Sequence, residues 1–167
     1  MRFHHSSRRI PYPVLAMNCD WKAGELSLTY TRTEPDGDTI RKPTDCVSRF
    51  RAAMGPDIEI RETAYIMGLS RSNQLRTFFK LSDGSVSGCM IDPRLIFSRL
   101  LLDHAQAFVL AHNHPSGNCA PSLADKKLTK TIYRASESLD IPLLDHIIVT
   151  TDSFYSFADS DPHSLSS

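Results

Sequence analysis

The sequence has no excess of charge of either sign, because its 167 residues contain 19 Lys and Arg and 19 Asp and Glu. A protein that binds nucleic acid usually carries a basic surplus or a basic stripe. The basic residues near the start, Arg2, Arg8 and Arg9, form only a short cluster, which we interpret as part of a solvated tail. The charge composition therefore does not support DNA binding.

Cysteines are few and far apart, and long apolar runs are missing. Cys19, Cys46, Cys89 and Cys119 form no C-x-x-C pair, which argues against a zinc ribbon and against a disulfide framework. No stretch approaches the roughly 18 apolar residues of a membrane span, and the first residues lack the apolar core of a signal peptide. We therefore predict a cytoplasmic protein in a reducing compartment, with no membrane contact.

The length and the hydrophobic fraction of 41% indicate a single globular domain with a real core. We predict an irregular arm over residues 1–22, one domain over 23–159 and a frayed tail over 160–167. Strand and helix patterns alternate irregularly, which predicts an α/β fold with a mixed sheet and helices on its faces. The predicted strands span residues 25–32, 59–69, 74–81, 107–111, 143–150 and 154–157, and the predicted helices span residues 45–54, 92–106 and 122–140.

The strand predicted over residues 25–32 alternates apolar and polar side chains, with Leu26 and Leu28 on one side. Such a strand at the edge of a sheet presents unpaired backbone groups that need cover. We therefore expect the protein to form at least a transient homo-oligomer.

The chemistry is concentrated in residues 107–125, AFVLAHNHPSGNCAPSLAD. Its apolar start predicts a buried strand that delivers His112 and His114 to its end, where residues two apart point to the same face. Ser122 opens a helical pattern, and Asp125 lies on the first turn of that helix. Two imidazoles and a carboxylate that converge in this way are typical of a three-ligand metal site with an open fourth position. A hydrolytic zinc ion needs that position for its water.

Other interpretations of these residues stay open at this point. Ser122 and Asp125 also fit a simple N-cap with a helix-start acid, which is worth about 1 kcal/mol. Two His and one Asp are the ligands of the facial triad in Fe(II) oxygenases as well. Residues 112–114 spell HNH, although nucleases of that name draw their residues from a spread-out ββα motif. Cys119 lies in the same loop but has no evident partner base.

The order His-x-His-Pro, with ten residues between His114 and Asp125 and a Ser three residues before that Asp, closely resembles the JAMM (MPN-type) metalloprotease signature. The longer string HNHPSGN, followed by LLDHIIV and YSFAD, resembles the RadC branch of that family over roughly residues 43–159. The resemblance implies a three-layer α/β/α fold similar to that of cytidine deaminases. It also implies one Zn²⁺ per chain, held by His112, His114 and Asp125.

The resemblance further implies a general base and an oxyanion donor. The stretch RETAYIMGL is similar to the family's Arg-Glu-x-Phe-x-x-x-x-Leu pattern and places Glu62 on the glutamate, although Ala64 stands where the family often has Phe. Glu59 is the competing acid, and its opposite parity on a strand would allow only one of the two to face the site. In the family's mechanism the zinc ion lowers the pKa of its water from about 15.7 towards 7. Glu62 accepts the proton, and Ser122 donates a hydrogen bond to the tetrahedral oxygen.

Three further residues are candidates for contacting the metal ligands and holding them in place. Metal-binding histidines usually donate their other N–H to a carboxylate or a carbonyl. Asp145 and His146, in LLDHIIV, are placed to take this role, with a core histidine as the competing interpretation of His146. Asn113 would point away from the metal ion on a regular strand and would brace the loop.

These patterns lead us to predict a zinc-dependent hydrolase that cleaves a peptide or isopeptide bond in a peptide or protein substrate. The alternative is a DNA-associated accessory protein of the RadC family, in repair or mobile-element maintenance, with an idle metal site. Longer RadC-type proteins carry an N-terminal helix-hairpin-helix region, and nothing in residues 1–42 resembles it. The neutral charge also argues against the alternative.

Overall fold

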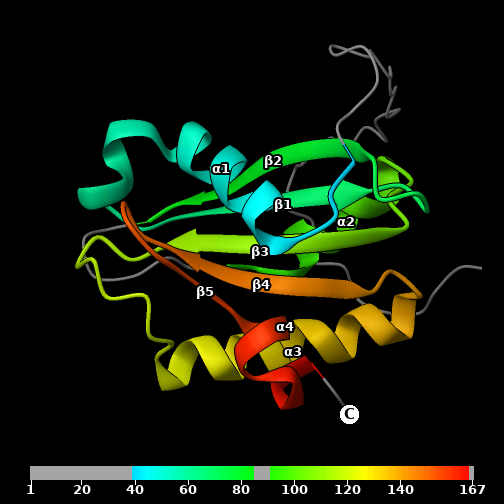
Figure 1. Cartoon of the computed structure of the whole chain (residues 1–167). Coiled ribbons are helices and arrows are strands. Elements are labelled where there is room, and N and C mark those ends of the chain that lie inside the picture. The colour runs from blue at the N-terminus through cyan, green and yellow to red at the C-terminus, as the bar shows by residue number, and fades with distance from the viewer. Residues whose placement is uncertain (1–38, 85–90, 166–167) are drawn as a thin grey trace, which may run out of the picture. The chain divides into compact units, whose positions relative to one another are not determined.

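The computed structural model describes residues 39–84 and 91–165 (Figure 1). All of these residues lie within one compact unit of the chain. The predicted arm over residues 1–22 and the predicted strand over residues 25–32 lie outside the described residues. The expectation of self-association, which depended on that strand, therefore stays a prediction.

Five strands in the described part of the chain form one mixed sheet in the order β2-β1-β3-β4-β5. The strands are β1 (Thr63–Leu69), β2 (Leu75–Asp83), β3 (Ala107–Asn113), β4 (Leu143–Val149) and β5 (Phe154–Ser156). The helices are α1 (Pro43–Met54), α2 (Pro93–Leu102), α3 (Leu123–Leu139) and α4 (Phe157–Ser160), with 3-10 helices at Gly55–Glu59 and Pro162–Leu165. The β3–β4 pair is parallel, and the other neighbouring strands are antiparallel.

Helices cover both faces of the sheet, which confirms the predicted three-layer α/β/α arrangement (Figure 1). On one face α1 packs buried side chains such as Phe50 against alternate residues of β1, β3 and β4. On the other face α2 and α3 contribute Ile96 and Ile132 to a second cluster. β1 and β3 are buried along their whole length because they lie between the two clusters. No helix within residues 39–84 and 91–165 has the length and apolar character to cross a membrane.

Several elements have bounds that differ from the prediction. The strand predicted over residues 74–81 continues to Asp83, and the helix predicted over residues 92–106 ends at Leu102. The strand predicted over residues 59–69 begins only at Thr63. Gly55 ends α1 with a φ of 57°, and the chain then enters a 3-10 helix instead of a strand. The strand predicted over residues 107–111 continues to Asn113, because β4 stays paired with it to its end.

The C-terminal residues that we predicted to be frayed are folded as far as Leu165. The Asp145 carboxylate accepts hydrogen bonds from the Ser156 hydroxyl at 2.6 Å and from the Ala158 N–H at 3.0 Å. These bonds fix the start of α4, and the following 3-10 helix packs against α3 with Ser164 buried. The prediction of a tail over residues 160–167 was wrong for residues 160–165, because the 3-10 helix packs against α3 and α4.

Cys46 on α1 gives a direct chemical test of this packing. Burial of the thiol, followed by the charges of Asp145 and Asp45, raises its pKa from 9.0 to about 12. At a given pH its thiolate fraction is therefore roughly a thousandfold smaller than that of an ordinary cysteine. We expect iodoacetamide to leave Cys46 unlabelled in the native protein while it labels the partly exposed Cys119, as measured by peptide mass spectrometry. Labelling of both cysteines in urea is the control, and equal native labelling would contradict the packing of α1.

Candidate metal centre

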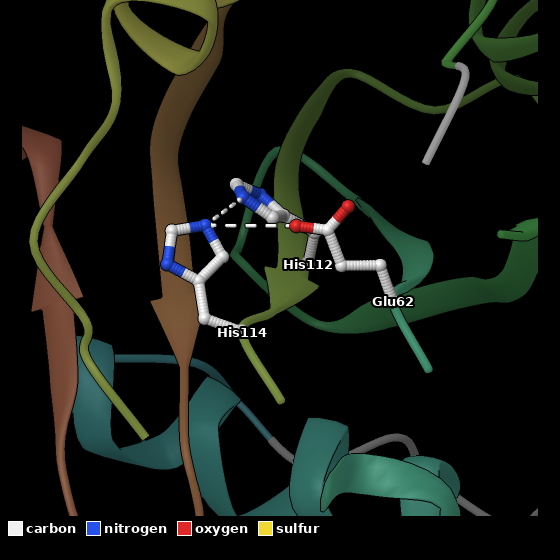
Figure 2. A group of neighbouring side chains, drawn as sticks. All are labelled: Glu62, His112 and His114. Atoms are coloured by element: carbon white, nitrogen blue, oxygen red, sulfur yellow. Dashed lines mark hydrogen bonds and ion pairs between the residues drawn. The ribbon is translucent and has the colours of Figure 1, made fainter. Parts of the chain in front are cut away.

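The C-terminal end of β3 brings His112 and His114 together. His112 lies on β3, and His114 directly follows the last residue of that strand, with its N–H still bonded to the Val149 carbonyl at 3.1 Å. The two side chains are two positions apart and therefore point to the same side of the sheet. Their Nε2 atoms lie 3.1 Å apart (Figure 2). β3 is the central strand of the sheet, so the surrounding strands and helices fix the backbone that carries both imidazoles.

Each of these imidazoles uses its Nδ1 atom for a contact outside the centre. The Nδ1 atom of His114 lies 2.8 Å from the carbonyl oxygen of Asn118, which can only accept, so Nδ1 carries the proton. The Nδ1 atom of His112 lies 2.9 Å from Nε2 of His146 on β4. With both Nδ1 atoms engaged, the two facing Nε2 atoms are the ones available to bind a metal ion.

His146 is completely buried and connects His112 to α3. Its burial and the neighbouring His112 imidazole lower its pKa well below the usual value, so the ring is neutral. Its Nδ1 atom lies 2.6 Å from the Thr129 hydroxyl, and that hydroxyl donates to the Asp125 carbonyl at 2.7 Å. Because the hydroxyl proton is used in this way, we assign the Nδ1 proton to His146, whose Nε2 atom then accepts from His112. This chain of hydrogen bonds sets the tautomer of His112.

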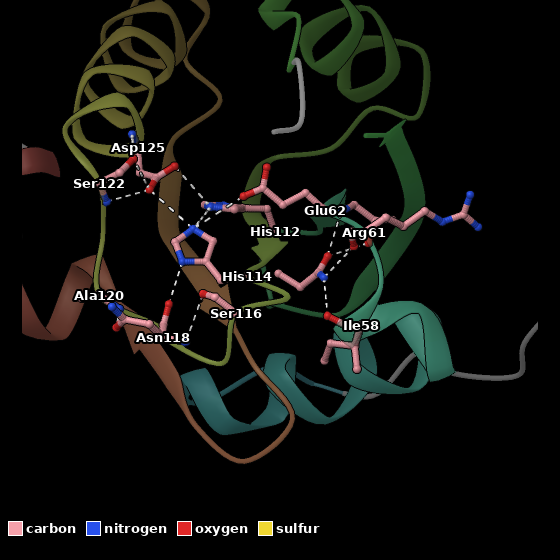
Figure 3. A network of polar contacts seen from close by, with 12 residues as sticks. Ile58, Arg61, Glu62, His112, His114, Ser116, Asn118, Ala120, Ser122 and Asp125 are labelled. Carbon is pink, nitrogen blue, oxygen red and sulfur yellow. Dashed lines mark hydrogen bonds and ion pairs between the residues drawn. The ribbon is translucent and has the colours of Figure 1, made fainter. Parts of the chain in front are cut away.

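Asp125 faces the same two imidazoles from the first turn of α3 (Figure 3). Its Oδ1 atom lies 3.2 Å from Nε2 of His112, and its Oδ2 atom lies 3.6 Å from Nε2 of His114. The Ser122 N–H and hydroxyl donate to Oδ2 at 2.7 and 2.6 Å, and the Asp125 N–H donates back to the Ser122 oxygen at 3.1 Å. Ser122 therefore caps α3 and also holds a carboxylate against the histidines, so the two interpretations of this pair are compatible.

The carboxyl group of Asp125 is ionised in this environment. Burial raises its pKa, but the neighbouring imidazoles of His112 and His114 and the hydrogen bonds from Ser122 outweigh that effect and hold the pKa well below its usual range. The same contact with Asp125 raises the pKa of His114, against the opposing effect of burial. A metal ion at this centre would replace a proton on the imidazoles, and its binding would therefore depend on pH.

Glu62 approaches the histidines from the end of the sheet where β1 begins. Its Oε1 atom lies 3.8 Å from Nε2 of His114, and its side chain is 18% exposed. Glu62, His112 and His114 offer ligand atoms that all lie within 4.8 Å of one another (Figure 2). The competing acid, Glu59, lies in the 3-10 helix instead of a strand and accepts a hydrogen bond from the Thr151 hydroxyl at 2.9 Å. The two imidazoles are therefore flanked by the carboxylates of Asp125 and Glu62.

The three candidate supporting residues occupy different places. His146 contacts His112 directly. Asp145, the residue before His146 on β4, accepts hydrogen bonds from Ser156 and Ala158 at the start of α4. Its carboxylate is therefore directed to those groups instead of the imidazoles. Asn113 binds the segment that precedes β1, as described below.

Sequence reasoning missed Thr129 and the backbone of Asn118. The position of Thr129 carried a usable indication, since it lies four residues after Asp125 and therefore on the same face of the helix. The Asn118 carbonyl carried none, because any residue type offers the same acceptor.

Thr129 and Thr131 form a matched pair on α3. Each hydroxyl donates to the carbonyl four residues earlier, at 2.7 and 2.9 Å, but only Thr129 contacts His146. We expect Thr129→Val to lower the free energy of unfolding by about 1–3 kcal/mol, because a buried imidazole N–H loses its acceptor. Thr131→Val at an exposed position should stay within about 0.5 kcal/mol. Urea denaturation of the metal-free proteins measures both, and equal losses would contradict the hydrogen-bond chain.

The α/β/α fold, with a His-x-His pair beside a helix-start aspartate, is consistent with a JAB/MPN domain. The RadC-like JAB domain family matches residues 40–162, most of the chain. The chain therefore belongs to the RadC-like JAB domain family, which confirms the resemblance seen in its motifs.

Curated relatives agree with this assignment. A UPF0758 protein of Flavobacterium johnsoniae is 43% identical over 98 residues, which cover 59% of this chain and 43% of that protein. A UPF0758 protein of Chlorobaculum tepidum is 38% identical over 104 residues (62% and 46%). A UPF0758 protein of Haemophilus ducreyi is 34% identical over 126 residues (75% and 56%). The chain spans about half the length of the curated relatives it matches.

Proposed function

We propose that the protein is a zinc-dependent hydrolase that cleaves a peptide or isopeptide bond in a peptide or protein substrate. The observation that carries the proposal is the pair of facing Nε2 atoms of His112 and His114, with carboxylates on two sides and both Nδ1 atoms engaged elsewhere. Two imidazoles and a carboxylate are a ligand set of catalytic zinc sites, which keep a further position open. The residues present therefore fit this metal ion.

We assign Asp125 to the metal ion and Glu62 to proton transfer. Asp125 is ionised, lies near both imidazoles and is held by two hydrogen bonds from Ser122, which are the properties of a ligand. Glu62 lies farther from His114, at 3.8 Å. Within the described residues no hydrogen bond engages its carboxylate, so its oxygens are available to accept a proton.

A bound Zn²⁺ would supply Lewis-acid chemistry, because it lowers the pKa of a water molecule to about 7 and polarises a carbonyl group. Glu62 accepts a proton from the attacking water and passes it to the leaving amine. The Ser122 hydroxyl, which donates to Asp125 in this structure, rotates to donate to the developing oxyanion. One such donor is worth about 3 kcal/mol in the transition state.

The proposal includes the cellular compartment and the class of substrate. We place the protein in the cytoplasm, because Cys46 and Cys119 are free thiols and the sequence offers no close cysteine pair. A peptide or protein is the proposed substrate, and self-association remains a prediction.

Measurement of bound zinc tests which of the two carboxylates, Asp125 or Glu62, is a metal ligand. We expect about one zinc per wild-type chain. His114→Ala and Asp125→Asn should each lower zinc affinity by more than about a hundredfold, because each removes a proposed ligand. Loss of a residue that only contacts a ligand costs about ten- to a hundredfold. Glu62→Gln should keep the wild-type zinc content. Elemental analysis after dialysis and competition with a chromophoric chelator measure these values, and loss of zinc in Glu62→Gln with retention in Asp125→Asn would exchange the two roles.

Cleavage of peptide and isopeptide libraries, followed by mass spectrometry, tests the activity itself. We expect the zinc-loaded protein to cleave a subset of substrates, a chelator to abolish cleavage and added zinc to restore it. Glu62→Gln should lose at least about a hundredfold in kcat with zinc still bound, because general base catalysis is worth about that much or more. Absence of cleavage in every library would contradict the proposal. Micromolar, salt-dependent DNA binding by such an inactive protein would favour the accessory role.

A further inference from the structure

Asn113 lies between the two histidines in the sequence, and its side chain is completely buried. Its Oδ1 atom accepts hydrogen bonds from the N–H and the hydroxyl of Thr63, at 2.7 and 2.8 Å. Its Nδ2 atom donates to the carbonyl oxygens of Ile58 and Arg61, at 2.7 and 2.8 Å. An Asn side chain has two acceptor lone pairs and two donor hydrogens, so these four bonds use its full capacity.

These bonds are made to residues on both sides of Glu62 in the sequence, because Glu62 lies on the same segment as Ile58 and Arg61 (Figure 3). The Arg61 carbonyl belongs to the peptide group before Glu62, and the Thr63 N–H belongs to the peptide group after it. Peptide groups are planar, so fixing both of them fixes the backbone of Glu62 and the direction of its side chain. The Glu62 carbonyl itself accepts a hydrogen bond from the Gly84 N–H at 2.8 Å.

Other contacts hold the two ends of this segment. Ile58 is buried in the core, the Glu59 carboxylate accepts a hydrogen bond from the Thr151 hydroxyl, and the Glu62 carbonyl accepts one from the Gly84 N–H. The 3-10 helix ends at Glu59, and the register of β1 with β3 begins at Ala64, opposite His112. Ile60 is 59% exposed, so its burial contributes little to the position of the segment. The Arg61 side chain pairs with Asp57, within the same stretch of chain. Asn113 links this segment to β3 through hydrogen bonds to groups on both sides of Glu62.

We propose that Asn113 is a positioning residue for Glu62, which it holds at a fixed place relative to His112 and His114. The inference rests on the base role of Glu62 proposed above. Asn113 and the two histidines are consecutive residues at the C-terminal end of β3, so one stretch of backbone sets the positions of both the proposed metal ligands and the proposed base. A buried amide that only stabilised the fold would leave the behaviour of the metal site unchanged.

The test uses the full chain loaded with Co²⁺, whose visible absorption reports the surroundings of the bound ion without any substrate. The visible spectrum of the Co²⁺-loaded protein is recorded as a function of pH, and the pH at which its change is half complete is the spectral midpoint. We expect Glu62→Gln to shift this midpoint, because the carboxylate next to the ion is lost. Asn113→Ala should shift the midpoint in the same direction. In the Glu62→Gln background Asn113→Ala should have little further effect, because two residues that act through one group are non-additive.

Three comparisons separate positioning from stability. Ser136 is also completely buried, with its hydroxyl donating to the Tyr133 carbonyl at 2.7 Å and accepting from the Leu143 N–H at 3.3 Å. Ser136→Ala should therefore lower the thermal midpoint and leave the spectral midpoint unchanged. Thr63→Val removes one of the four bonds and should give a smaller shift, which keeps the test decisive if Asn113→Ala does not fold. Asn113→Ala should also retain metal ion, because every ligand is intact.

Each result supports or overturns the inference. An unchanged midpoint in Glu62→Gln would overturn the base role of Glu62 and the positioning role with it. A shift in Glu62→Gln that Asn113→Ala and Thr63→Val both lack would overturn the positioning role alone. Full additivity of Asn113→Ala with Glu62→Gln would overturn it too, because Asn113 would then act on the metal ion by another route.

Discussion

The alternation of side chains along β3 is the constraint on which the candidate site depends. His112 and His114 leave the strand on one face, and Asn113 between them engages the segment before β1. This works because β3 is the central strand, with antiparallel β1 on one side and parallel β4 on the other. β4 supplies His146 beside His112, and β1 begins just after Glu62. A shift of one residue in the register of β3 would exchange the two faces and separate every one of these pairs.

Hydrogen bonds engage the buried polar groups around the candidate site. His146, Asn113 and Thr129 are completely buried, and each has its hydrogen-bonding groups engaged. Such networks rigidify a core when they are fully satisfied and destabilise it when they are not. In the described part of the chain the buried side-chain atom left without a hydrogen bond belongs to Asp103, outside the site. The orientation of the imidazoles is therefore a property of the folded protein.

The sequence predicted the parts of the site that depend on local spacing. His112 and His114 lie two apart on a strand, and Ser122 and Asp125 lie three apart at a helix start, so strand and helix geometry alone place each pair. The position of Glu62 came from the family resemblance, because it depends on a contact with Asn113 about 50 positions away in the chain. The same limit applies to Asp145, whose bonds to Ser156 and Ala158 at the start of α4 were not predicted. Contacts that join distant segments have no periodicity in the sequence.

Two separate hydrogen-bond systems support the proposed ligands and the proposed base. The chain from His112 through His146 and Thr129 ends on the Asp125 carbonyl, so it joins two of the proposed ligands. The bonds of Asn113 reach only the segment around Glu62. No residue is shared by the two systems, although both begin on β3. A substitution in the first system should therefore act on metal affinity, and one in the second on proton transfer, because the two systems share no hydrogen-bond partner.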